Sequence, residues 1–470
     1  MRVSLLLSML AVLVAGCRTF CAPVEPYVEA RVGQAAEVRA AEKPVARPAE
    51  IPTLPPLPQL DDVWNLAIDH NPALREAAGG LEAARGRLLQ SSLYLNPDFT
   101  YQETGIGDSR AAAGTLNLIL RQEIITAGKR RLDMAAAARG ADVAYLALVT
   151  RKFDVLGRIR RAYYDYVALS HILEVNDEVV TALARDTEAT RKLVEEAETR
   201  PPADLVRMKA LVEDAKASRV LAEAAYVAAW KQLAAEVGVP ELSFPKKRPP
   251  FFEALPDLDA DPVTARVLRA NTELRQLEMQ IEQSRAQLAR SQVAAVPNVT
   301  LGAGYQNNFT AGQPGAILSV QVPLPIWDRK QGLVWESQAR LAQSTAALRT
   351  AETRLSRDTA NAYGRYLGLK EQEDRLTREV LPLLVEGLKA VQDLFAGGDA
   401  RRSFADVLLA QQNLNATKLR RADVRRSLLQ AYADLQALMQ LDVDESPESG
   451  PPPEELPPPG ARPRVPPPQK

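Results

Sequence analysis

The sequence contains two copies of one long unit, and this duplication limits what the chain can fold into. Asn71 recurs as Asn271, an offset of 271 − 71 = 200 residues, and Pro97 recurs as Pro297. The same offset relates Leu74 to Leu274, Arg75 to Arg275, Arg85 to Arg285, Leu88 to Leu288, Thr100 to Thr300, Tyr163 to Tyr363 and Tyr166 to Tyr366. Chance does not explain so many identities at one offset, and the period is too long for a solenoid of small repeats. The sequence therefore predicts two similar halves.

Each copy opens with the signals of a helix. Asn71 suits an N-cap and Pro72 suits the first helical position, and Asn271 can cap in the same way. We expect these helices to run to Pro97 and Pro297.

Two short alternating segments follow each of these prolines. They are residues 99–102 and 116–121 in the first copy, and residues 299–305 and 318–324 in the second. Apolar and polar residues alternate in each segment, as in a half-buried strand, and "GDSRAAAG" and "NNFTAGQPG" supply the turns. The pattern predicts one β-hairpin per copy.

A long helical pattern follows each hairpin. No proline occurs between Gly128 and Arg200, so this helix can extend roughly 100 Å. It turns at "TRPPAD" and returns over about residues 205–237. The second copy matches, with a helix from Gln331, a turn at "AGGDARRS" and a return over residues 404–441. Helices so poor in breakers are typical of coiled coils, although their heptads are irregular.

The link between strand and helix in the second copy reads "VQVPLPIWDRKQG". Its prolines end the strand, Trp327 follows, and then the basic pair Arg329-Lys330 opens the helix. The first copy has a basic pair in the same place, Lys129-Arg130. Because a strand that leaves a bilayer often ends at an interfacial aromatic residue followed by charge, we assign Trp327 to the membrane interface.

The four predicted strands are long enough to cross a membrane as a tilted sheet, at about ten residues each. They cannot close a barrel alone, because the smallest bacterial barrels use about eight strands and lipid does not tolerate an open edge. Several copies of the chain must therefore contribute strands. The alternative is a soluble four-stranded sheet beside the helices.

The N-terminus has the pattern of a signal peptide. Met1-Arg2 precedes the apolar run "LLLSMLAVLVAG", which is too short to span a bilayer, and Cys17 follows. "VAGC" resembles the bacterial lipobox, in which cleavage before the cysteine leaves a lipid-carrying thiol. The alternative is a plain secretory signal with a chance cysteine. Cys21 is the only other cysteine, so no disulfide framework is possible, and we take it as an unpaired thiol.

The composition divides the chain into folded and extended parts. Proline-rich stretches at both ends, such as "PTLPPLPQL" and "PPPEELPPPGARPRVPPPQK", cannot bury enough apolar surface to fold alone. We expect a signal peptide at 1–16, a lipidated tether at 17–60, a first repeat at 61–240, a linker at 241–259, a second repeat at 260–443 and a disordered tail at 444–470. The 58 basic and 59 acidic residues give no net field that would favour nucleic acid.

No catalytic or metal-binding motif is present in the sequence. His70 and His171 are the only histidines and lie far apart, which excludes a histidine-rich metal site. We interpret His70 as a polar residue near a helix end and His171 as a helix-surface residue. The sequence predicts neither an enzyme nor a cofactor.

Taken together, these motifs resemble the TolC-like outer-membrane efflux family. The resemblance rests on the lipobox, the duplicated plan, Asn71-Pro72, the two prolines before the strands and "GGDARRSFADVLLAQQNL". It implies a mostly α-helical fold with a small transmembrane β part. Three copies would form a twelve-stranded β-barrel in the outer membrane, continued by an α-helical barrel through the periplasm. "PLPIWDRKQG" is most similar to the cobalt–zinc–cadmium efflux branch.

The resemblance also implies a function and its site. The protein would be the outer-membrane channel of a tripartite efflux system, joined by a periplasmic adaptor to an inner-membrane pump, with metal ions passing through as cargo. Asp393 and Asp399 would lie near the constricted periplasmic entrance; alternatively, Asp393 is a solvated helix residue and Asp399 a turn residue paired with Arg401 or Arg402. Rival functions are a periplasmic lipoprotein adaptor and a coiled-coil scaffold without a pore.

The two hairpin tips differ in sequence and should offer a partner different contacts. The first copy turns at Pro201-Pro202, whereas the second turns at Gly397-Gly398, where glycine can end a helix with a positive φ. Tips of two kinds would alternate around a ring.

Replacing Cys17 by Ser is expected to abolish incorporation of labelled fatty acid, because the lipobox makes that thiol the acceptor. Labelling of the protein in growing cells measures this. Cys21→Ser is the matched control and should label like the parent. Undiminished labelling of Cys17→Ser would exclude lipidation at this residue.

Overall fold

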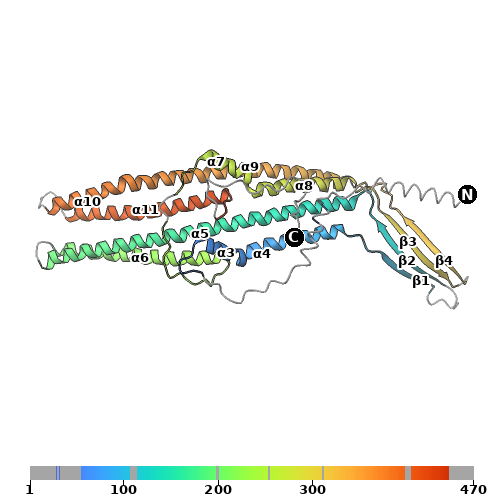
Figure 1. Ribbon diagram of the computed structural model, residues 1–470, viewed down its shortest axis with the longest axis horizontal. Helices are drawn as coiled ribbons and strands as arrows, with labels where there is room; N and C mark the ends of the chain where they lie inside the picture. The colour runs from blue at the N-terminus through green and yellow to red at the C-terminus, as the bar shows by residue number, and fades with distance from the viewer. Residues whose placement is uncertain are drawn as a thin grey trace, which may run out of the picture.

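The protein is elongated, with helices along its length, a four-stranded sheet at one end and the ends of two helical hairpins at the other (Figure 1). The structure is a computed structural model. It describes residues 28, 31, 54–105, 114–196, 201–251, 255–309, 312–396 and 404–443.

The two copies have the same order of elements. The first consists of α3 (Leu60–His70), α4 (Pro72–Ser92), β1 (Asp98–Thr104), β2 (Thr115–Ile124), α5 (Lys129–Glu195) and α6 (Pro202–Val237). The second consists of α7 (Ala260–Ala270), α8 (Thr272–Gln292), β3 (Val299–Asn308), β4 (Gln313–Gln321), α9 (Gln331–Arg375), η1 (Leu376–Val380), α10 (Leu381–Ala396) and α11 (Phe404–Leu438). This order confirms the predicted duplicated, mostly helical plan.

The predicted caps are present. The side-chain oxygens of Asn71 and Asn271 each accept a backbone N–H two residues ahead, at 2.9 Å. The short helices α3 and α7 that precede these caps were not predicted. The prediction that the capped helices run to the prolines was wrong, because α4 ends at Ser92 and α8 at Gln292. Each proline restricts the residue directly before it, Asn96 or Val296, so the prolines do not set these earlier helix ends.

Gly238 ends α6 and packs closely against the residues that begin α4. Its φ is +95°, and a Cβ there would lie 3.0 Å from the Cα of Asn71, so only glycine fits. Asn71 Nδ2 also donates to the carbonyl of Glu236 at 2.7 Å. In the second copy the side chain comes from the other partner, since Gln440 Oε1, just after α11, accepts from the backbone N–H of Thr272 in α8 at 2.8 Å.

The two long hairpins differ in continuity. α5 runs for 67 residues without a break, which corresponds to roughly 100 Å. In the second copy the predicted single helix from Gln331 is interrupted by the π-helical turn η1, where Leu381 N donates to the carbonyl of Leu376. Pro382 follows and has no N–H for the normal helical bond. Such π-turns often occur at functional positions in helices.

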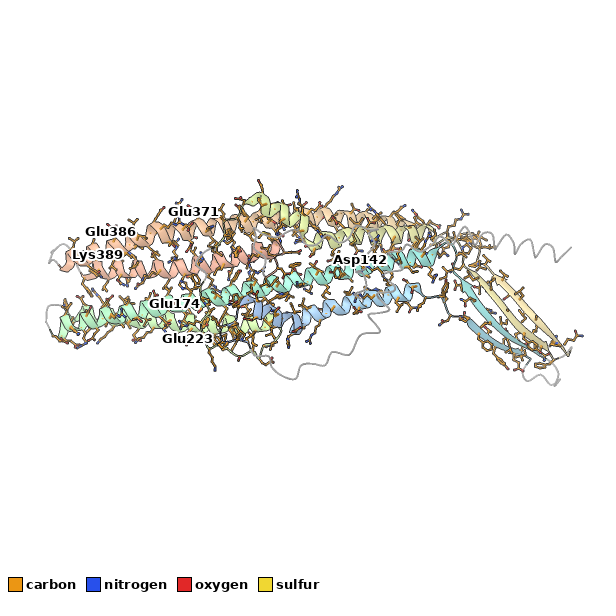
Figure 2. The ribbon with its side chains drawn as sticks, in the orientation of Figure 1. Asp142, Glu174, Glu223, Glu371, Glu386 and Lys389 are labelled. Atoms are coloured by element: carbon orange, nitrogen blue, oxygen red, sulfur yellow. The ribbon has the colours of Figure 1, made fainter. Side chains whose placement is uncertain are left out.

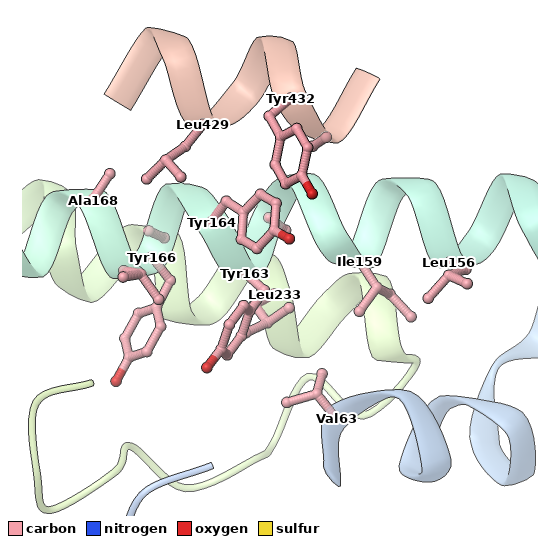
Figure 3. Close-up of a cluster of buried hydrophobic side chains, with 14 of the residues drawn as sticks. Val63, Leu156, Ile159, Tyr163, Tyr164, Tyr166, Ala168, Leu233, Leu429 and Tyr432 are labelled. Atoms are coloured by element: carbon pink, nitrogen blue, oxygen red, sulfur yellow. The ribbon is translucent and has the colours of Figure 1, made fainter. Parts of the chain in front are cut away.

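The core lies at the middle of the molecule, where α3, α6 and α11 pack against α5 (Figure 3). Aromatic side chains repeat there at the offset of the duplication. The hydroxyl of Tyr163 donates to the carbonyl of Pro58 at 3.3 Å, and that of Tyr363 donates to the carbonyl of Leu258 at 2.9 Å. Each repeat thus places one tyrosine hydroxyl on the segment that enters its first short helix.

A partly buried carboxylate joins the two copies beside this core. Asp165 on α5 accepts from Arg426 Nε at 2.6 Å and from Gln430 Nε2 at 2.8 Å, and both donors lie on α11. Its side chain is only 15% exposed, so solvent screens this contact less than a surface ion pair. The contact fixes the second hairpin against the first.

The sheet has the order β1-β2-β3-β4, with every pair antiparallel. The two predicted hairpins are therefore present and lie side by side. The prediction that the last strand continues to Leu324 was wrong, because β4 ends at Gln321. Pro323, two residues beyond Gln321, has no N–H to donate to a neighbouring strand.

The described parts of the expected tether and linker contact the folded body. Leu54 and Leu258 pack on the core, and Val28 is buried against α4 and α5. Arg31 binds Asp142 of α5 at 2.9 Å. In the described ranges no helix has both the length and the apolar character needed to span a membrane.

Candidate functional site: the two-faced sheet and its junction with the helices

One face of the sheet is apolar along all four strands. Residues that face each other across antiparallel strands lie on the same face, so the register assigns every side chain. The apolar face carries Phe99, Tyr101, Leu116, Leu118, Leu120, Ile124, Val299, Leu301, Ala303, Tyr305, Pro314, Ala316, Leu318 and Val320, with Glu103, Gln122 and Asn307 as its polar members.

These apolar side chains are open to the surroundings in the single chain. Leu318 is 79% exposed, Phe99 68% and Val320 62%. No other element covers this face in the described structure (Figure 1). An exposed apolar surface of this extent indicates contact with lipid or with another protein.

The opposite face is polar. It carries Asp98, Thr100, Gln102, Thr104, Thr115, Asn117, Arg121, Glu123, Thr300, Gly302, Gly304, Gln306, Asn308, Gln313, Gly315, Ser319 and Gln321, with Ile119 and Ile317 as its apolar members. A sheet with one apolar and one hydrated face is the arrangement of a transmembrane barrel wall.

Two glycines on β3 let the polar face pack closely. A Cβ at Gly302 would lie 2.3 Å from the hydroxyl oxygen of Ser319, and one at Gly304 would lie 2.3 Å from the carbonyl oxygen of Leu118. Ile119 lies over both glycines and is 7% exposed. The side chain of Ile119 is therefore folded down onto the backbone of β3.

Lys129 fixes the sheet to the helices in the first copy. It begins α5, is 5% exposed, and donates from Nζ to the carbonyl of Val296 and to Asn298 Oδ1, the latter at 2.7 Å. Asn298 Nδ2 in turn donates to Glu123 Oε1 at 2.7 Å. Burial lowers the pKa of Lys129 and the neighbouring Arg290 lowers it further. The network connects the end of β2, the start of β3 and the start of α5.

Arg130 completes this junction on the side of α4. Its guanidinium donates to the carbonyl of Ser92 at 2.7 Å and lies 3.8 Å from the ring centroid of Tyr94. The predicted basic pair of the first copy is thus a structural joint.

The equivalent residues of the second copy are far more exposed. Trp327 is 87% exposed, and Leu324 and Ile326 beside it are 75% and 56% exposed. In the part of the chain that the structure describes, the ammonium of Lys330 pairs with Asp328, and Lys330 has a positive φ of +60°. The assignment of Trp327 to a membrane interface stays a prediction.

The predicted gate and tip residues lie at the end of the molecule away from the sheet. Asp393 is an exposed residue in the last turns of α10, beyond Glu386 and Lys389 (Figure 2). Pro201 caps α6 and Pro202 is its first residue, and both are exposed. The roles of Asp393, Pro201 and Pro202 stay predictions.

The other predicted site residues, Gly397, Gly398, Asp399 and Cys17, lie outside the described residues.

The two histidines occupy separate places. His70 Nδ1 lies 3.0 Å from the carbonyl oxygen of Leu66 at the end of α3, and His171 stacks on Phe251 with ring centroids 4.0 Å apart. Within the ranges the structure describes, no three His, Cys, Asp or Glu side chains come together as metal ligands would.

A second charged cluster lies beside η1 and was not predicted. Glu373 forms ion pairs with Arg421 and Arg425 of α11, each with an N···O distance of 3.5 Å. Burial lowers the pKa of Arg425, while Glu373 opposes that shift. Together with His171 and Phe251, these arginines border a cavity of about 240 Å³. The ion pairs hold α11 to the chain just before the helix becomes π-helical. Nothing in the sequence indicated that these charges meet.

Charge on the apolar face of the sheet is expected to destabilise the folded protein, because Arg pays a large transfer cost in lipid. Leu318→Arg should cost about 2–4 kcal/mol, and Val320→Arg, one residue from the end of β4, should cost less. The control Ser319→Arg, on the opposite face, should cost much less than either. Urea unfolding in lipid vesicles measures the free energies. Equal costs at 318 and 319 would indicate a soluble sheet.

Comparison with known proteins identifies a family in the second copy. Residues 263–439 match the outer membrane efflux protein family. The cobalt-zinc-cadmium resistance protein CzcC of Cupriavidus metallidurans is 25% identical over 393 residues, which cover 81% of this chain and 89% of that relative.

Solved structures share the fold over both copies. CusC matches with a TM-score of 0.67 at 15% identity, covering 85% of this chain and 99% of CusC. The open state of the outer membrane channel MtrE of Neisseria gonorrhoeae matches with a TM-score of 0.66 at 19% identity, covering 84% of this chain and 93% of MtrE. The second copy thus matches the outer membrane efflux protein family, and the chain as a whole is similar to a cobalt-zinc-cadmium resistance protein and has the fold of these solved channel structures.

Proposed function

We propose that the protein is the outer-membrane channel of a tripartite efflux system. Three copies join their sheets into one twelve-stranded barrel, and their helices continue the channel into the periplasm. A periplasmic adaptor links this channel to an inner-membrane pump. Substrates, here divalent heavy-metal cations, pass through the channel passively, and the pump supplies the energy.

The two-faced sheet is the observation that carries this proposal. Phe99, Leu318 and Val320 are exposed on one face, while Thr100, Ser319 and Gln321 lie on the other. A soluble sheet in contact with water on both faces would expose its apolar side chains at a large cost. A barrel wall places the same residues against lipid and the polar ones against an aqueous lumen.

The length of the helices supports a periplasmic tunnel. α5 alone spans roughly 100 Å, and both hairpins end at the side of the molecule opposite the sheet (Figure 1). In the channel, those ends form the periplasmic entrance and meet the adaptor. The exposed Trp327 lies at the inner surface of the outer membrane, and a lipid on Cys17 anchors the chain to the same membrane.

Similarity to a cobalt-zinc-cadmium resistance protein supports metal cations as the cargo. We propose that the cations interact weakly with acidic groups as they pass, since conduction requires sites that ions can leave. The rival functions, an adaptor or a scaffold without a pore, give no role to a sheet with one lipid-like face.

Loss of the protein is expected to lower tolerance to cobalt, zinc and cadmium in a cell that retains the pump and adaptor. The purified protein should also form conducting channels in planar bilayers. Growth at graded metal concentrations and single-channel recording measure these effects. An assembled protein that fractionates with the periplasm and conducts no ions would support the adaptor or scaffold instead.

Removing acidic charge at the entrance is expected to raise conductance or reduce preference for cations, because three copies present each carboxylate three times in a narrow mouth. Asp393→Asn together with Asp399→Asn tests this in planar bilayers. Glu386→Gln is the matched control, one heptad further from the hairpin end and about 10 Å away along the same exposed helix face. If the double variant conducts like the parent, both residues are surface charges and the constriction lies elsewhere.

A further inference from the structure

The cavity of about 240 Å³ beside η1 has one strongly basic wall. Lys418, Arg421 and Arg425 of α11 line it, and their spacing of three and four residues places all three on one face of the helix. Glu373, which pairs with the two arginines, does not itself line the cavity. Burial lowers the pKa of Arg425, and the charge of Arg421 lowers it further, as expected for cations that repel each other.

Two of these cations have donors that the described part of the chain does not use. Lys418 makes no ion pair or hydrogen bond with any described residue. Arg421 directs Nε toward Glu373 at 3.5 Å, and its two terminal amino groups bond to nothing else in the described ranges. An ammonium group offers three N–H donors and a guanidinium five, so this wall can still bind an anion.

The remaining walls are mainly apolar. Phe251, from the linker between the two copies, stacks on His171 of α5 with ring centroids 4.0 Å apart. Val175 of α5 and Leu381, the first residue of α10, also line the cavity. A molecule with a carboxylate at one end and an apolar group at the other matches both kinds of wall.

Glu178 limits the charge that such a molecule can carry. It lies on α5, is the acidic side chain of the cavity lining, and makes no ion pair with the described residues. Its carboxylate repels a second negative charge in the cavity. The lining therefore favours a monoanion over a dicarboxylate or phosphate.

We propose that this cavity binds a small monocarboxylate that carries an apolar or aromatic group, with the carboxylate on Lys418 and Arg421 and the apolar group against Phe251 and Leu381. The volume is below that of pockets for drug-sized ligands, roughly 300–1,000 Å³, which indicates a smaller molecule. The proposal does not depend on the channel function, because one chain supplies every lining residue.

Leu381 connects this cavity to the interruption of the helix. Its backbone N–H donates to the carbonyl of Leu376 and closes the π-helical turn, while its side chain lines the cavity. A bound ligand thus contacts α5, α10 and α11 together, at the position where the second hairpin changes its helical geometry. Binding should slow hydrogen exchange of the backbone amides in residues 376–384, because it opposes local opening there.

Phenylacetate is a suitable probe, since it has one carboxylate, one aromatic ring and about ten non-hydrogen atoms. Ligand-observed NMR titration of the full-length protein in lipid nanodiscs at neutral pH should show saturable binding. A Kd of about 1 mM is expected for so small a ligand. Hydrogen exchange followed by mass spectrometry, with and without saturating phenylacetate, measures the effect on residues 376–384.

Lys418→Gln is the most direct variant, because Lys418 makes no contact with the described residues that the fold would lose. It should raise the Kd about tenfold, since it removes a hydrogen bond between charged groups. Arg421→Gln should have a similar effect but also weakens the pair with Glu373. Arg420→Gln is the matched control, because it removes the same charge from an exposed neighbouring position outside the lining, and it should bind like the parent.

Glu178→Gln tests the selectivity of the cavity for monoanions. In the parent protein, phthalate and inorganic phosphate should each bind at least about tenfold more weakly than phenylacetate. In Glu178→Gln this difference should shrink severalfold, because the repelling carboxylate is gone. A purely structural role of Glu178 would leave the ratio of the Kd values unchanged.

Four results would contradict the proposal. Absence of saturable phenylacetate binding to the parent, or equal Kd values for Lys418→Gln and Arg420→Gln, would overturn the site. Phosphate that binds more tightly than phenylacetate would overturn the assignment of the ligand class, and unchanged exchange at 376–384 would overturn the connection to η1. Planar-bilayer conductance tests the channel separately, so a conducting protein that does not bind phenylacetate rejects this inference alone.

Discussion

Backbone hydrogen bonding at the edges of the sheet is the constraint on which the rest of the structure depends. A strand in lipid must satisfy its N–H and C=O groups with other strands, and a four-stranded sheet leaves two edges unsatisfied. The apolar face and polar face fix how the sheet can curve, with lipid outside and water inside. Closure by further copies then sets the positions of α4, α5, α8 and α9, because each of these helices precedes or follows a strand. Lys129 makes that connection rigid by binding the entrance to β3 as it begins α5.

Much of the architecture could be predicted because the duplication repeats local signals. Asn71 and Asn271 cap equivalent helices, and alternation located all four strands. The error at the end of β4 is instructive. Apolar alternation continues through Leu324, but Pro323 stops pairing with β3, so the pattern and the ladder end at different residues. Alternation of apolar and polar residues shows which face of the sheet a side chain occupies, whereas the end of a strand is set by the neighbouring strand with which it pairs.

The residues that sequence reasoning missed act across long separations. Lys129 and Asn298 are 169 positions apart, and neither is unusual in its local sequence. The pair Glu373 and Arg425 joins two helices of one hairpin, yet it becomes apparent only when the phase of both helices is known. The π-turn at Leu376–Val380 has no sequence signature beyond the nearby Pro382. Hydrophobic periodicity carries none of this information, because it describes one element at a time.

The two kinds of seam in a ring of such chains need not be equally strong. Within a chain, Asp165 of α5 is held by Arg426 and Gln430 of α11. The equivalent of Asp165 in the second copy is Arg365, and α6 and α11 correspond at an offset of 202, as their positive-φ end residues Gly238 and Gln440 show.

The positions on α6 that match Arg426 and Gln430 are therefore Ala224 and Ala228, both exposed. If three copies close into a ring with the symmetry of the repeat, the contact equivalent to α5 on α11 is α9–α10 of one copy on α6 of the next. Arg365 then faces two alanines, and the charged contact is absent from that seam. Packing of apolar side chains must hold that seam, and such contacts can slide more readily than a bidentate ion pair. The same side of the channel carries η1 and Pro382, which interrupt the helix that would have to move. Movement that widens the tunnel is therefore expected between copies, at α6 against α9–α10, while the seam within each chain stays closed.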